Sequence, residues 1–216
     1  MIACSSPSPQ NNSTNGNINS RVIENNSVSN VDQPRNRITT PNRPLREVVV
    51  IPKPEKELTK QQLFSGALES HNRVRAKHGL TPLKWSNKLA AYSQEWSDHL
   101  GGGRSCKMYH RSGRPAYGEN LFISSAKVWT HEGKEVSREK NNVTIRDVVK
   151  KWADEEMYYN YNTNSCQPGQ QCGHYTQIVW RNTTEVGCAV TFCPDESQNW
   201  VCSYNPPGNF IGQRPY

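Results

Sequence analysis

Long apolar runs are missing from this 216-residue chain, in which only 33% of the residues are hydrophobic. No stretch of about 18 or more apolar residues occurs, which excludes a membrane-spanning helix. Zinc-finger spacings and ribonucleoprotein motifs are also missing, and the 26 basic residues are scattered among 19 acidic ones. The net charge of +7 therefore does not predict nucleic-acid binding, and it is more consistent with weak attraction to anionic surfaces such as membranes or bacterial walls.

The motifs of the common hydrolases are absent as well. The sequence contains neither G-x-S-x-G nor H-E-x-x-H. A protease would also need a nucleophile or a firmly held metal-bound water, together with a group that stabilises the oxyanion. We therefore expect a protein that is not an enzyme, and a metal-dependent, peptidase-like hydrolase is the alternative.

Aromatic residues are missing from the first 55 positions. This segment is dense in Asn, Ser and Pro, as in SSPSPQNNSTNGNINS, and it cannot bury enough apolar surface to offset the entropy of folding. We predict that residues 1–55 form a disordered tail or tether and that residues 56–216 form one folded domain. All six tryptophans lie in the second part.

Seven cysteines are present, and six of them lie between Cys106 and Cys202. An even set inside the folded part predicts three disulfides and therefore an oxidising location, outside the cell or at its surface. A zinc site is the alternative, but the five residues between Cys166 and Cys172 exceed the usual ligand spacing.

The seventh cysteine, Cys4, stands alone near the start of the sequence. Two interpretations stay open. The small residue before it and the Ser-Ser-Pro after it are similar to the end of a bacterial lipoprotein signal, so Cys4 would carry a lipid anchor. Otherwise it is an incidental cysteine in a disordered tail.

Apolar spacing and capping residues predict three helices ahead of the predicted strands. The first carries Leu58, Leu63, Leu68 and Val74 at helical spacing, with Thr59 as a possible cap and Gly79 at its end, and His71 is expected to pack or cap within it. The second has its N-cap at Ser86 and the apolar stripe Leu89, Tyr92, Trp96 and Leu100. The third begins at Thr144, with Asp147 three residues on, and carries Ile145, Val148, Val149, Trp152 and Glu156 or Met157.

Alternating patterns follow later in the chain. YTQIVW, VGCAVTF and NWVCSY predict strands, and THEGKEVSREKNN before the third helix is interpreted as a surface loop. Helices first and strands afterwards indicate an α+β arrangement in which helices cover a sheet.

Four stretches carry a specific family signature: GHYTQIVWRNTTEVGCAV, VCSYNPPGNFIGQRPY, HNRVRAKHGLTPLKWSNKLAAYSQEWSDHL and YGENLF. They resemble the CAP superfamily of cysteine-rich secretory proteins, antigen 5 proteins and plant pathogenesis-related class 1 proteins, with the plant branch closest. The resemblance covers residues 58–216 and not the tail. It implies a three-layer α-β-α sandwich with a central, mainly antiparallel sheet.

The resemblance also implies three disulfides: Cys106–Cys193, Cys188–Cys202 and Cys166–Cys172. The family has a central cleft lined by two histidines and two glutamates. The matching positions here are His110 in MYHRS, Glu119 in GEN, Glu155 in WADEE and His174 in CGHYTQ. Counting to the YNYN that follows favours Glu155 over the adjacent Glu156.

The chemistry of such a tetrad favours a weak metal site. Two imidazoles can bind one divalent transition metal, and neighbouring carboxylates can accept the second ring N–H and fix the tautomer. We expect His110 and His174 to bind Zn²⁺ or another divalent metal weakly, because zinc usually takes three or four protein ligands. A metal-free His–Glu network that braces the cleft is the alternative.

The first functional hypothesis is a secreted or surface-tethered binding module, defence-related or antimicrobial, for a lipid, sterol or cell-surface component, or weakly for a metal. The hydrolase described above is the second. The third is a precursor protein, because PPGNFIGQRPY (206–216) resembles a signalling peptide released from plant relatives. The competing interpretation of this segment is that it seals the edge of the sheet.

Overall fold

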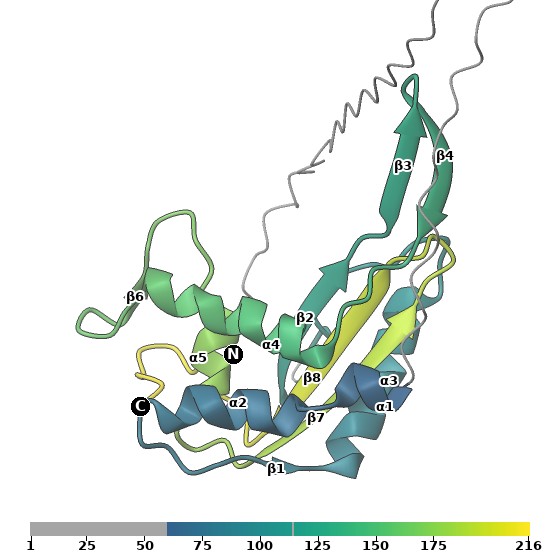
Figure 1. Cartoon of the computed structure of the whole chain (residues 1–216). Coiled ribbons are helices and arrows are strands. Elements are labelled where there is room, and N and C mark those ends of the chain that lie inside the picture. The colour runs from purple at the N-terminus through teal and green to yellow at the C-terminus, as the bar shows by residue number, and fades with distance from the viewer. Residues whose placement is uncertain (1–59, 114) are drawn as a thin grey trace, which may run out of the picture. The chain divides into compact units, whose positions relative to one another are not determined.

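The computed structural model describes residues 60–113 and 115–216 (Figure 1). The expectations for the 1–55 tail, Cys4, Leu58 and Thr59 lie outside these residues. The helices are α1 (Lys60–Phe64), α2 (Ala67–Ala76), α3 (Asn87–Gly101), α4 (Ile145–Ala153), the 3₁₀ helix η1 (Asp154–Tyr158) and α5 (Gly173–Ile178). The strands are β1 (Lys84–Trp85), β2 (Gly118–Ser124), β3 (Lys127–His131), β4 (Lys134–Glu139), β5 (Tyr159–Asn160), β6 (Ser165–Cys166), β7 (Glu185–Phe192) and β8 (Gln198–Asn205).

A four-stranded sheet in the order β1-β7-β8-β2 forms the middle layer of the folded unit. Strands β7, β8 and β2 are antiparallel, and the short β1 runs parallel to β7. Helix α3 packs on one face against β7 and β8, while α2, α4 and α5 lie together on the other side (Figure 1). The predicted α-β-α sandwich with a mainly antiparallel sheet is confirmed.

Small residues let α3 approach the sheet closely. The Ser93 hydroxyl donates to the Gly187 carbonyl oxygen at 2.9 Å, and the Ser97 hydroxyl donates to that of Asn199 at 2.8 Å. A Cβ at Gly187 would lie 2.2 Å from the backbone nitrogen of Ala90, so only glycine fits there. The predicted Ser86 cap is present, since its hydroxyl accepts the Leu89 N–H at 3.4 Å.

The single helix predicted from residue 58 to Gly79 is two helices. Gly66 has φ +81°, a left-handed conformation that separates α1 from α2, and Gly79 has φ +63° in the turn after α2. His71 and Arg75 of α2 are both fully buried. The break lets α2 lie along the core while α1 covers its end.

Arg75 joins the segment after α2 to the end of α5 and the turn that follows it. Its guanidinium donates at 2.8–3.1 Å to the carbonyl oxygens of Thr81, Ile178, Trp180 and Thr183. Burial lowers the pKa of Arg75 to about 10, so the group stays charged at neutral pH. A buried cation is tolerated here because backbone oxygens replace its hydration.

The prediction that YTQIVW forms a strand was wrong. These residues belong to α5 and the turn after it, and Tyr175, Ile178 and Val179 are buried at helical spacing. The N–H groups of His174 and Tyr175 donate to the carboxylate of Glu155, which caps the first turn. The apolar pattern fits both the period of a strand and that of a helix. The Glu155 carboxylate, which accepts the first N–H groups, favours the helix.

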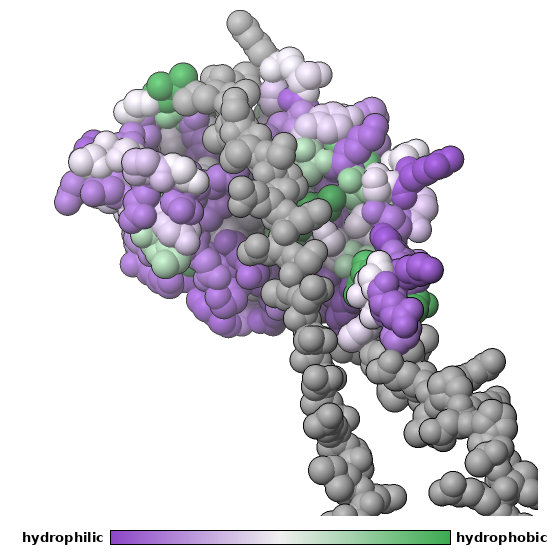
Figure 2. Space-filling view, turned by 90° about the horizontal axis from the view of Figure 1, so that it is seen from above, coloured by the Kyte–Doolittle hydropathy of each residue, from purple (hydrophilic) through white to green (hydrophobic). Residues whose placement is uncertain are grey.

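The segment 130–142, interpreted as a loop, is largely a hairpin. Strands β3 and β4 pair across a turn in which Glu132 and Gly133 have φ +47° and +73°, as a tight hairpin turn requires. The hairpin exposes three apolar side chains, those of Val128, Trp129 and Val136, beside charged residues of the same two strands. In Figure 2 the visible surface is mostly hydrophilic, with apolar residues in small separate patches.

Helix α4 begins as predicted. The Thr144 N–H donates to the Asp147 carboxylate at 2.8 Å, and the apolar stripe from Ile145 to Trp152 is buried. The expected continuation of the stripe to Glu156 or Met157 is wrong, because α4 ends at Ala153 and Met157 in η1 is 69% exposed.

All three disulfides implied by the resemblance are present: Cys106–Cys193, Cys188–Cys202 and Cys166–Cys172. The second joins residues that face each other across β7 and β8. The third closes the loop immediately before α5, and the first ties the segment after α3 to the end of β7. In the part of the chain that the structure describes, no helix is long and apolar enough to cross a bilayer.

Candidate functional site

His174, the second residue of α5, is held by Glu155 of η1. Its Nδ1 lies 2.5 Å from Glu155 Oε1, and Glu155 Oε2 accepts the N–H groups of His174 and Tyr175 at 3.0 and 3.2 Å. The adjacent Glu156 contacts Lys77 and His78 instead. Glu155 is therefore the glutamate that pairs with His174.

His110 is held by Glu119 in the same manner. Its Nδ1 lies 2.8 Å from Glu119 Oε1, which also accepts the Arg111 N–H at 3.3 Å. The Glu119 side chain is only 8% exposed, and its Oε2 has no hydrogen-bond partner among residues 60–113 and 115–216. The Nε of the Arg111 guanidinium lies 3.9 Å from this oxygen.

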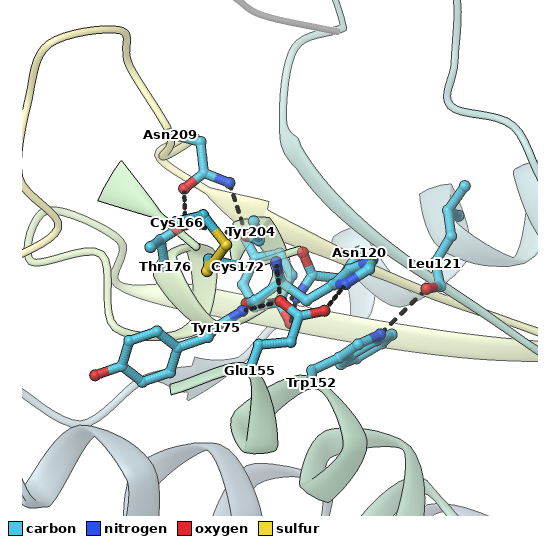
Figure 3. Close-up of polar contacts among 12 residues, drawn as sticks. Asn120, Leu121, Trp152, Glu155, Cys166, Cys172, Tyr175, Thr176, Tyr204 and Asn209 are labelled. Atoms are coloured by element: carbon cyan, nitrogen blue, oxygen red, sulfur yellow. Dashed lines mark hydrogen bonds and ion pairs between the residues drawn. A yellow bond between two sulfur atoms is a disulfide. The ribbon is translucent and has the colours of Figure 1, made fainter. Parts of the chain in front are cut away.

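Strand β2 connects the two His–Glu pairs. Glu119 points to one face of the sheet and the next residue, Asn120, points to the other. Asn120 Nδ2 donates to the backbone oxygen of His174 at 3.1 Å and to the Tyr204 hydroxyl at 3.2 Å (Figure 3). Two neighbouring residues of one edge strand therefore contact the two halves of the tetrad, Glu119 as part of one half and Asn120 through the backbone of the other.

Trp152 supports the ring of His174 from α4. The two rings stack with centroids 5.8 Å apart and an interplanar angle of 20°, and Trp152 Nε1–H donates to the Leu121 oxygen at 3.1 Å. Neither Asn120 nor Trp152 was among the site residues predicted from sequence. The sequence could have indicated both, because Asn120 follows Glu119 directly and Trp152 lies three positions before Glu155.

Both imidazoles present the same arrangement of nitrogens. A carboxylate at Nδ1 favours the tautomer with the proton on Nδ1, which leaves a lone pair on Nε2. Neither Nε2 has a hydrogen-bond partner in the described part of the chain. The His110 and His174 side chains are 39% and 22% exposed, so both are accessible from solvent. Each ring could therefore offer its Nε2 to a metal ion, with its glutamate as the outer partner.

A second group of potential ligands lies in the core. His71, Cys188 and Cys202 bring ligand atoms within 4.8 Å of one another, and no other such trio occurs among the described residues. The two sulfurs form a disulfide, and the nitrogens of His71 lie 2.7 Å from the Ala67 oxygen and 2.9 Å from the Tyr204 hydroxyl. His71 is therefore a core residue, as expected.

Burial determines the charge of His71. Desolvation lowers its pKa to about 4, because the fully buried ring cannot be charged without losing its hydration. The backbone oxygen of Ala67 opposes this shift and the Arg75 cation adds to it. The ring is neutral at physiological pH, with Nδ1–H donating to the backbone and Nε2 accepting from Tyr204.

The sequence model of the CAP family, described as the cysteine-rich secretory protein family, matches residues 68–204. The chain belongs to the CAP family. The match includes all four tetrad positions, His110, Glu119, Glu155 and His174, and it ends before the segment 206–216.

Curated relatives place this CAP domain near plant proteins. It is 41% identical over 149 residues to pathogenesis-related protein 1B of Nicotiana tabacum, covering 69% of this chain and 78% of that protein. It is 39% identical over 165 residues to pathogenesis-related protein PR-1 of Medicago truncatula, covering 76% and 85%.

A solved structure shares the CAP fold. The crystal structure of NaASP2 with Zn²⁺ matches with a TM-score of 0.53 and 22% identity, over 76% of this chain and 88% of that one.

Proposed function

We propose that this CAP domain is an extracellular, defence-related binding module that binds one divalent transition-metal ion weakly through Nε2 of His110 and His174. The observation that carries the proposal is the pairing of each Nδ1 with a glutamate, at 2.8 Å for His110 and 2.5 Å for His174. A carboxylate in that position raises the basicity of the opposite nitrogen and fixes the ring.

Several features support a weak site. Two imidazoles leave positions on the ion for water, so affinity is expected to be far below that of closed four-ligand zinc sites. Zinc is the first ion to test, since the neighbour NaASP2 was solved with Zn²⁺. A location outside the cell agrees with the three disulfides, which persist in oxidising compartments.

A defence-related role is supported by the identity of 39–41% to plant pathogenesis-related proteins. Binding of a lipid or sterol is a separate prediction, testable by titrating the purified protein with such ligands. Absence of saturable binding would remove that hypothesis.

Release of residues 206–216 as a peptide is opposed by the hydrogen bonds around Asn205–Pro206. The Asn205 oxygen accepts the Thr184 N–H at 2.9 Å, and the Pro206 oxygen accepts the Thr183 hydroxyl at 2.9 Å. A protease would need this end of β8 to open first. We therefore expect no free peptide in the medium of cells that secrete the protein, as mass spectrometry can check.

Calorimetric titration with ZnCl₂ tests the metal proposal. Wild type is expected to bind one ion, and His110→Gln and His174→Gln are each expected to lower the affinity at least tenfold. His131→Gln, in the β3–β4 hairpin, is the matched control and should bind as wild type does. Equal binding by wild type and the double variant His110→Gln/His174→Gln would place the ion elsewhere and refute the proposal.

A further inference from the structure

The C-terminal segment 206–216 binds α5, the helix that carries His174. Asn209 Nδ2 donates to the Gly173 oxygen at 2.8 Å, and Asn209 Oδ1 accepts the Thr176 hydroxyl at 2.7 Å (Figure 3). These partners lie on either side of His174 in the first turn of α5. Asn209 has φ +58°, a conformation that asparagine tolerates better than most residues.

The same segment makes a second contact further along α5. The backbone N–H of Gly208 donates to Gln177 Oε1 at 3.0 Å. A Cβ at Gly208 would lie 2.6 Å from the ring of Trp180, so the close approach of this backbone depends on glycine.

The last residue of the segment reaches α5 from the other side. The ring of Tyr216 is stacked between those of His78 and Tyr161, with centroids at 4.1 and 4.8 Å. Its hydroxyl lies 3.1 Å from that of Tyr175, the residue after His174, and the Tyr161 hydroxyl donates to its backbone oxygen at 2.6 Å. The segment therefore contacts α5 near its start, through Gly208 and Asn209, and at its last residue, Tyr216.

Helix α5 needs such support because it has only 6 residues. A helix this short is not stable by itself in water, so its position depends on outside contacts. Glu155 and Asn120 hold the backbone of His174 from η1 and β2. Asn209 binds the same turn from the C-terminal segment.

We propose that the segment 206–216 is a positioning element for the His174–Glu155 half of the site, and that Asn209 and Tyr216 are its positioning residues. The proposal rests on the proposed function only where metal binding is concerned. The His110–Glu119 half lies on β2 and the segment before it, and within the described ranges it has no hydrogen bond to residues 206–216. Detachment of the segment therefore disables one half of the site and leaves the other intact.

Amide hydrogen exchange of the ¹⁵N-labelled full chain tests the proposal without metal. Asn209→Ala removes two hydrogen bonds to the first turn of α5, so protection of the His174 and Tyr175 N–H groups is expected to fall about tenfold or more. Ile211→Ala is the matched control, since Ile211 belongs to the same segment and is 69% exposed. It should leave this protection unchanged.

Two readouts separate positioning from a general loss of stability. The ring resonances of His174 should shift in Asn209→Ala while those of His110 stay in place. Asn209→Asp, which keeps the acceptor for Thr176 and loses the donor to Gly173, should recover part of the protection. It also provides the test if the alanine variant does not fold. Equal behaviour of Asn209→Ala and Ile211→Ala, or equal changes at both histidines, would overturn the proposal.

Zn²⁺ binding is measured as a separate test. If wild type binds Zn²⁺, Asn209→Ala is expected to weaken binding at least fivefold, and unchanged affinity would refute the link to the site. If wild type binds no Zn²⁺, the proposed function fails, while amide exchange still decides whether the segment positions α5.

Discussion

The neutral core histidine, His71, predicts a specific loss of stability in acid. Its pKa is lowered from 6.5 to about 4 by burial in the folded protein. As the pH falls below 6.5, the unfolded chain takes up a proton that the folded protein does not. Folding therefore becomes less favourable between the two pKa values. From about pH 7 to about pH 4.5, linkage gives a loss of about 2 to 3 kcal/mol in the free energy of unfolding.

Urea unfolding of wild type and His71→Gln, measured at several pH values in this range, checks the prediction. The variant is expected to be less stable at neutral pH, because it loses fitted contacts to Ala67 and Tyr204. Its further loss on acidification should be smaller than that of wild type by about 2 to 3 kcal/mol, because the remaining histidines contribute equally to both proteins. Parallel pH profiles of the two proteins would refute the assignment of a neutral, buried His71.

Three further predictions concern stability and are measured by urea unfolding at neutral pH. Arg75→Gln should cost about 3 kcal/mol or more, because buried carbonyl oxygens lose their donors, and a cost below about 1 kcal/mol would contradict the buried network. Thr144→Ala should cost about 1 kcal/mol through loss of the cap on α4, with no change expected if the helix start is not capped. Replacing Cys166 and Cys172 together by serine should cost about 2 kcal/mol, because their bridge closes a loop with a sequence separation of only 6. A much larger cost would mean that the loop before α5 depends on the bridge for packing.

Helix starts and the two long strands were predictable from local sequence. Ser86 and Thr144 mark helix ends by side-chain chemistry that acts within three residues. Strands β7 and β8 were identified from their alternating sequence, although β8 is buried on both faces because helices cover both sides of the sheet.

Helix α5 was not predictable in this way. Tyr175, Ile178 and Val179 satisfy a helical period, yet the same six letters also alternate. The decision comes from Glu155, 19 residues away from His174, whose carboxylate binds the first N–H groups of the helix. Such a contact exists only after the chain has folded.

The candidate site followed from the family resemblance and not from spacing. His110, Glu119, Glu155 and His174 lie on four separate segments, and nothing local in the sequence says that they pair. The structure supplies the pairing and adds Asn120 and Trp152 as supports of His174. Arg75 was expected to be one of many scattered basic residues, but the carbonyl oxygens of a buried turn bring it into the core.

The central claim is that the two glutamate-bound histidines form one weak metal site. The most direct test is a crystal of the full chain soaked in Zn²⁺, with anomalous diffraction measured above and below the zinc edge. The account predicts one peak within about 2.0–2.1 Å of Nε2 of both His110 and His174. A map without a peak there, or with zinc bound only at other residues, would contradict it.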